Sequence, residues 1–267
     1  MLVHNKLLAF SAIVGAGLVS AQTISVSLSE SCTSALKGLL TSPEAACLNP
    51  SAFLSFFVGT DKSIPDTIDN WLSGLCASGS CSSESLTAVV TNVTQGCTQD
   101  LSNAGVNISS LQSTITDIVQ QAYPTARKVV CLKDNAADKL CVTQTLNSLE
   151  SVIGKLTLDD LSFFDLVGDI QKLLSSDLPN LACTSCTKEA FTIVQQAFPD
   201  IVSEITQPVQ NVCGASFVDG ASSNSVSETA AQGQFAVAVD NSVLAIQPSG
   251  RFGLALLLFS AMFVVFM

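Results

Sequence analysis

The chain has 267 residues, of which 48% are hydrophobic and only 12% charged, with a formal net charge of −11 and ten cysteines. So few charges argue against an intrinsically disordered chain, and the acidic balance argues against a protein that binds nucleic acid through phosphates. The length suits one large or two small domains with a hydrophobic core.

Residues 1–21 have the pattern of a secretory signal peptide. Lys6 gives a basic start, an apolar run follows from Leu7 to Leu18, and small residues precede a cleavage site before Gln22. The alternative, an uncleaved membrane helix, is disfavoured by the short apolar run. The single histidine, His4, leaves with this peptide, which excludes Ser–His, Cys–His and His–metal sites from the mature protein.

The region 22–213 is predicted to be an all-α, disulfide-stapled helical bundle. Apolar residues recur at helical spacing in three stretches, namely Leu86–Cys97, Leu111–Ala122 and Ala190–Phe198. Ser42-Pro43 and Asn49-Pro50 pair an N-cap residue with a proline at the first helical position. Further boundary signals are a capping arrangement of Thr157 with Asp160 before the apolar run Leu161–Leu174, and helix ends at Pro124 and Pro199.

The cysteines divide five and five between two halves, residues 22–125 and 126–213. An even number in a secreted chain predicts five intramolecular disulfides without a free thiol, and an odd number in each half requires a bridge between the halves. Cys183 and Cys186 form a C-x-x-C pair, for which we prefer a structural role over a redox or zinc site. The predicted disulfide cysteines are Cys32, Cys47, Cys76, Cys81, Cys97, Cys131, Cys141, Cys183, Cys186 and Cys213.

Two local similarities predict that the halves are degenerate copies of one helical module. Residues 75–89 parallel residues 182–194 around a close cysteine pair, and Ile118–Pro124 parallels Ile193–Pro199. The two similarities have different offsets along the chain, so an alignment of the halves needs a large insertion.

Few residues in the region 22–213, the expected extracellular part of the chain, suggest catalytic activity. Asp159-Asp160 and Asp165 with Asp169 could be imagined as a glycosidase pair, but a helix N-terminus and a solvated helix face that also carries Lys172 explain them better. The sequence has no fingerprint for a cofactor and no recognisable metal site. We therefore expect neither catalysis nor a bound cofactor.

Three further features concern packing and modification. Asn92-Val93-Thr94 and Asn107-Ile108-Ser109 are N-glycosylation sequons. Phe53, Leu54, Phe56, Phe57 and Val58 form an apolar cluster that either belongs to the core or lines a cavity for a hydrophobic ligand. Trp71 and Tyr123, each unique in the chain, are expected to anchor packing.

The C-terminal region predicts a stalk and a lipid-anchor signal. Residues 214–241 are rich in Ser, Ala and Gly and are expected to form a flexible stalk with a mean reach of about 30 Å. Residues 242–267 end in an apolar run from Phe252 to Met267, about 24 Å as a helix, which is shorter than the roughly 30 Å hydrocarbon core. Small residues upstream of it favour GPI attachment at Asn241, with Asp240 as the second choice and a single-pass anchor as the alternative.

Three segments carry a resemblance to a known family: Cys131-Leu132-Lys133-Asp134-Asn135, Cys141–Leu146 and Cys183–Lys188. In these the chain resembles secreted, often GPI-anchored cysteine-rich proteins of basidiomycete fungi that carry a domain of unknown function. The resemblance implies a fungal extracellular protein but does not imply any particular activity.

The sequence therefore predicts a non-enzymatic, GPI-anchored structural or interaction module of a fungal cell surface. Its expected partners are the outer leaflet of the plasma membrane, through the lipid, and components of the cell wall, but no nucleic acid. The alternative is an extracellular carrier of a lipid or other hydrophobic ligand, with Phe53–Val58 on the wall of its cavity.

Overall fold

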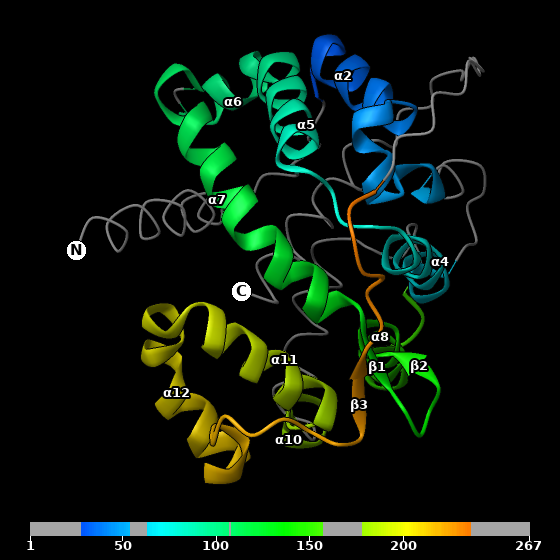
Figure 1. Ribbon diagram of the computed structural model, residues 1–267, viewed down its shortest axis with the longest axis vertical. Helices are drawn as coiled ribbons and strands as arrows, with labels where there is room; N and C mark the ends of the chain where they lie inside the picture. Colours follow the sequence, from blue (N-terminus) through cyan, green and yellow to red (C-terminus); the bar gives the residue numbers. More distant parts are fainter. Residues whose placement is uncertain (1–27, 54–62, 107, 157–177, 236–267) are drawn as a thin grey trace.

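The computed structural model describes residues 28–53, 63–106, 108–156 and 178–235. These residues form nine α-helices, three short 3-10 helices and one small three-stranded sheet, which confirms the predicted all-α, disulfide-bonded fold (Figure 1). No helix within these ranges has the length and apolar character needed to cross a membrane.

The N-terminal half is a set of helices that mostly start at a serine. The side chains of Ser29, Ser42, Ser63 and Ser82 each accept a hydrogen bond from a backbone N–H in the first turn of the element that follows, which satisfies an otherwise unpaired donor. The elements are α2 (Glu30–Leu40), η1 (Pro43–Leu48), η2 (Pro50–Phe53), α4 (Ile64–Ala77), α5 (Ser83–Gly96), α6 (Thr98–Asn103) and α7 (Ile108–Val130).

The start predicted at Ser42 is confirmed, although the element is a 3-10 helix. The start predicted at Asn49-Pro50 is confirmed too, since the 3-10 helix η2 begins at Pro50, although Asn49 also ends η1, in the left-handed conformation with φ of 51°. The Asn49 side-chain amide donates to the Trp71 carbonyl at 3.0 Å, and the Trp71 indole donates to the Leu48 carbonyl at 2.7 Å. Trp71 therefore anchors packing as predicted.

The helix end predicted at Pro124 is wrong, because α7 continues through this residue to Val130. Proline in a helix interior costs about 3 kcal/mol. Burial on both sides of it offsets that cost, since Ala122, Arg127 and Val129 are all buried and the Tyr123 hydroxyl accepts from the Cys81 N–H at 3.0 Å. The long helix consequently runs from α5 and α6 to the sheet and connects the two halves (Figure 1).

The C-terminal half combines a hairpin with shorter helices. The elements of this half are β1 (Leu132–Asp134), β2 (Lys139–Leu140), α8 (Cys141–Ile153), α10 (Leu178–Ala182), α11 (Ser185–Ala197) and α12 (Pro199–Cys213), and η3 (Ala215–Phe217) and β3 (Val226–Glu228) follow it. The boundary at Pro199 is confirmed: α11 ends at Ala197 and Pro199 is the first residue of α12. The sheet has the order β2-β1-β3, and β3 pairs antiparallel with β1 so that Lys133 lies opposite Ser227.

The largest apolar core surrounds α4. Residues of α4 pack against Cys131, Leu140 and Val142, so this cluster already joins the two halves. Two smaller clusters lie around Leu132 near the sheet and around Cys47 below α5.

All ten cysteines are paired, as predicted, and no described cysteine is free. Four bridges lie within a half and one joins the halves, in agreement with the odd count in each half. The pairs are Cys32–Cys97, Cys47–Cys81, Cys76–Cys131, Cys141–Cys186 and Cys183–Cys213.

The similar sequence segments do not occupy equivalent positions in the two halves. Cys81 precedes the N-cap of α5, whereas Cys186 lies inside the first turn of α11, after the N-cap Thr184. Ile118–Pro124 is the middle of α7, but Ile193–Pro199 spans the end of α11 and the start of α12. The shared feature is the bridge between the second and fourth cysteines of each half, so common cysteine order does not impose a common helical module.

The flexible stalk predicted from residue 214 is wrong as far as residue 235. Phe217, Val226 and Ala230 are buried, and β3 is a strand of the sheet. A few apolar side chains in a Ser- and Gly-rich stretch are enough to fix the segment because the backbone forms hydrogen bonds with the core. The remainder of the predicted stalk, residues 236–241, lies outside the described residues.

Candidate functional site

The most distinctive site is the junction of the halves, crossed by residues 226–235, which we call the strap. The strap begins as β3 and continues past both cysteines of the bridge between the halves. Thr229 donates to the Cys131 carbonyl from its N–H at 3.0 Å and from its hydroxyl at 2.7 Å, and the Ala231 N–H donates to the Cys76 carbonyl at 2.7 Å. The strap therefore binds the backbone on each side of the Cys76–Cys131 disulfide.

The far end of the strap lies against the loop between α4 and α5. The Ser80 N–H donates to the Gly233 carbonyl at 2.8 Å, and the Phe235 N–H donates to the Ser80 carbonyl at 2.9 Å. A Cβ on Gly79 would lie 2.5 Å from the backbone of Gln234 and Phe235. Only glycine permits this close approach.

A buried arginine joins the strap to the N-terminal half. Arg127 of α7 is 7% exposed. Its Nη1 donates to the Ala231 carbonyl at 3.1 Å and its Nη2 donates to the Ser78 carbonyl, while its Nε has no partner among the described residues. Backbone carbonyls thus partly satisfy a charge that would be costly to bury alone.

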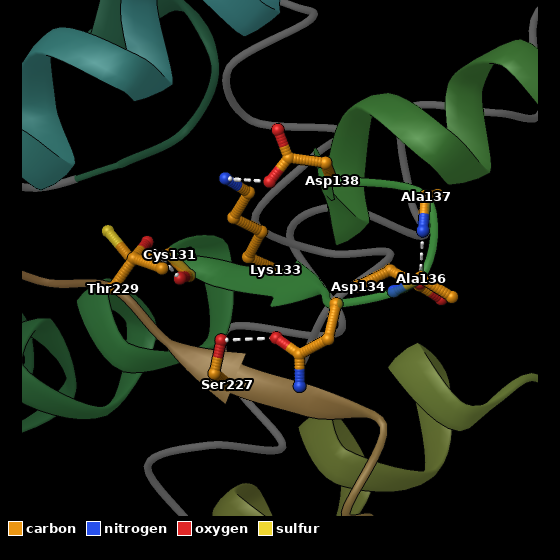
Figure 2. Close-up of polar contacts among 9 residues, drawn as sticks. Cys131, Lys133, Asp134, Ala136, Ala137, Asp138, Ser227 and Thr229 are labelled. Carbon is orange, nitrogen blue, oxygen red and sulfur yellow. Dashed lines mark hydrogen bonds and ion pairs between the residues drawn. The ribbon is translucent and has the colours of Figure 1, made fainter.

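The turn between β1 and β2 is fixed by contacts among its own residues (Figure 2). The Asp134 carboxylate accepts from the N–H groups of Ala137 and Ala136 at 2.8 and 2.9 Å. These bonds favour the charged form and so lower the pKa of Asp134 below its ordinary value, and the bond from Ala137 contributes most. Lys133 forms an ion pair with Asp138 at 2.6 Å.

The loop before the strap is fixed to α11 by charge. Lys188 pairs with Asp219 at 3.0 Å, and the Glu189 carboxylate accepts from the Ser223 N–H at 2.6 Å. The hydrogen bond from the Ala221 N–H, and to a smaller extent that from Lys188, lowers the pKa of Asp219 below its ordinary value. Two neighbouring residues of α11 thereby position residues 219–223.

A second surface feature is a shallow groove of about 590 Å³ between α5 and α7. Thr87, Thr91 and Asn92 line it from α5, and Gln120 lines it from α7. The Gln120 amide donates to the Ser83 carbonyl at 3.0 Å and to the Thr87 hydroxyl at 2.8 Å. The predicted glycosylation residue Asn92 is exposed at the border of this groove.

The structure separates the C-x-x-C pair into two bridges, since Cys183 binds Cys213 and Cys186 binds Cys141. The C-x-x-C pair is therefore not a dithiol, in agreement with the structural role predicted for it.

Several predicted residues lie outside the described part of the chain. They are Asn107, Asn241 with Asp240, the carboxylates Asp159, Asp160, Asp165 and Asp169, and Leu54–Val58 of the apolar cluster, whose Phe53 has only its backbone described.

Sequence reasoning missed Arg127 and the strap. An arginine in a helix gives no sign that it will be buried, because its partners are carbonyls distant in sequence. The strap gives almost no strand signal, because its buried apolar residues Val226 and Ala230 are separated by three polar residues and do not alternate with them. The three residues of β3 are too few to separate a strand from a linker.

Within the described ranges, no group of three or more His, Cys, Asp or Glu side chains is placed to hold a metal ion. Comparison of the chain with protein-family models, with curated proteins and with solved structures finds no match. The five disulfides indicate an extracellular or secreted protein.

Proposed function

We propose that this protein is a non-enzymatic module displayed on the outer surface of a fungal cell, held by a GPI lipid on Asn241. In this proposal the described residues form a rigid head that contacts components of the cell wall. The five disulfides support a location outside the cytosol. The apolar C-terminal tail and the small residues before it support the lipid anchor.

The observation that carries the proposal is the strap. Its last contact, between Phe235 and Ser80, lies six residues before Asn241. Six residues reach at most about 20 Å, so a lipid on Asn241 would hold the head close to the bilayer. A force on the anchor would be transmitted to the head at the junction, where the strap lies beside the disulfide that joins the halves.

Release of the protein from intact cells tests the anchor. Phosphatidylinositol-specific phospholipase C should release it, and the C-terminal peptide of the released protein should end at Asn241 with a glycan attached. Replacing Asn241 alone would shift attachment to Asp240, so the double variant Asp240→Leu/Asn241→Leu is the one expected to abolish surface display. A protein that stays on the cells with residues 252–267 attached contradicts the proposal.

The absence of catalysis is a separate part of the proposal. After loss of His4 no side chain has an unperturbed pKa between 5 and 8, and the cysteines are oxidised. The secreted ectodomain should show no turnover of ester, glycoside, peptide or disulfide substrates. Turnover that disappears in Asp165→Asn or Asp169→Asn would contradict this.

A further inference from the structure

We infer that Asn92 is a glycosylation site that is filled before α5 folds, and that the first sugars of its glycan then occupy the groove between α5 and α7. This inference rests on the secretory part of the proposed function.

The native position of the sequon shows why modification has to come first. A sequon is read through its threonine as well as its asparagine. Asn92 is exposed, but Thr94 is 4% exposed and its hydroxyl donates to the Val90 carbonyl at 2.8 Å. A transferase cannot contact this threonine in the folded helix.

Local unwinding of α5 is opposed by the packing of its C-terminal end. Cys97 directly follows α5 and is bonded to Cys32 of α2. A Cβ on Gly96 would lie 2.1 Å from the Cβ of Ala35, so α2 and α5 are in close contact at this turn. The sequon is therefore accessible only before the Cys32–Cys97 bridge and the contact between these helices have formed.

The direction of the Asn92 side chain points to the occupant of the groove. Side chains on a helix tilt toward its N-terminus, so a group on Asn92 extends over the preceding turn. That turn contains Ala88 and Thr91, and Thr87 lies just before it; all three line the groove. The Thr91 hydroxyl can donate to a sugar hydroxyl, and the Gln120 side-chain oxygen can accept from one, while the Gln120 NH2 remains bonded to Ser83 and Thr87.

The chain offers a matched control for the groove. Glu204→Asn creates a sequon with Ile205 and Thr206 on the exposed face of α12. Thr206 donates to the Val202 carbonyl at 2.8 Å, the same helical hydrogen bond that Thr94 makes, although Thr206 is only partly buried. None of these three residues lines the α5–α7 groove.

The first experiment expresses the full chain with Asn107→Gln in a yeast secretory host and measures glycan occupancy of Asn92 by peptide mass spectrometry, together with the disulfides. Occupied Asn92 is expected. An unmodified Asn92 in a protein with all five disulfides overturns the inference alone. A protein without glycan and without disulfides instead shows that the chain does not enter the secretory pathway, which also overturns the proposed function.

The order of events is tested with refolded, unglycosylated protein and purified oligosaccharyltransferase with its lipid-linked sugar donor. The reduced, unfolded chain should be modified at Asn92 and the folded chain should not. Equal modification of both would show that the folded sequon is accessible, and would overturn the inference that glycosylation precedes folding of α5.

The groove is tested by native digestion with endoglycosidase H. The Asn92 glycan should be removed about tenfold more slowly than the glycan of Glu204→Asn, because several sugar hydrogen bonds have to break first. After denaturation both should be removed at the same rate. Equal rates in the native proteins would show that the glycan does not occupy the groove.

Discussion

The two halves of the head contain the same number of cysteines but differ in how much of each helix is buried. Helix α4 in the N-terminal half buries eight of its 14 residues, whereas α12 in the C-terminal half buries only Val202 of its 15. Ile205 and Val212 of α12 are 43% and 49% exposed. All five cysteines of the N-terminal half are buried, but Cys183 and Cys213 are not.

This difference shows that cysteine number does not measure how strongly a region is held. The N-terminal half and the junction share the α4 core, and there the disulfides add to apolar burial. The C-terminal half has a smaller core around Leu132 and depends on the sheet and on the charged contacts of α11. We therefore expect equivalent changes to cost more near α4 than near α12.

The largest difference is expected between two disulfides. Replacing the Cys76–Cys131 pair by alanines should lower the free energy of unfolding by about 4 kcal/mol, because it frees a long loop and disturbs the core beneath the strap. Replacing the Cys183–Cys213 pair should cost about 2 kcal/mol, since this bridge closes a shorter loop at a partly exposed site. Urea unfolding measures both, and equal losses would contradict the comparison.

The next largest loss of stability is expected when the buried charge of Arg127 at the junction is removed. Arg127→Met should cost about 2–3 kcal/mol, because the carbonyls of Ser78 and Ala231 lose their charged donor. Lys128→Met, at the exposed neighbouring position on α7, should change stability by less than about 0.5 kcal/mol. If thermal unfolding shows the same small change for both, Arg127 does not hold the strap.

Two glycines provide a smaller and more local test. Gly79→Ala should cost about 1–3 kcal/mol, since its Cβ would meet the strap backbone. Gly38→Ala in α2 meets no atom within 4 Å and should stabilise the helix by about 0.5–1 kcal/mol. Limited proteolysis should cut the strap of Gly79→Ala first, and unchanged resistance there would argue against the close contact.

These tests also indicate which parts of the molecule the sequence can predict. Apolar spacing in Leu86–Cys97 and the N-cap of Ser42 are local signals, and both are confirmed. The helical path through Pro124 depends on long-range contacts, such as that of Tyr123 with Cys81, which override a local helix breaker. The number of bridges follows from the even cysteine count, but their connectivity does not.

The same limit explains the error in residues 214–235. Composition alone describes a linker, yet Gly79, Arg127 and the Cys131 carbonyl, all distant in sequence, hold this segment in place. A site built from backbone carbonyls leaves no motif in the sequence.

The smallest predicted effect is on acid sensitivity. The folded-state pKa of Asp134 lies below its ordinary value, so its contribution to stability is present at neutral pH and is lost as pH falls through the folded-state pKa. Asp134→Asn should therefore show a smaller loss of stability between neutral and acidic pH than the unmodified protein. Parallel urea curves at several pH values would reveal it, and identical pH dependence would contradict it.

Hydrogen–deuterium exchange of the secreted ectodomain tests most directly whether the strap belongs to the head. The N–H groups of Thr229, Ala231 and Phe235 should exchange as slowly as those in the middle of α4, because each donates to a backbone carbonyl of the junction. Exchange of all three at the rate of an unstructured chain would support the flexible stalk that the sequence predicts and would contradict the account of the junction.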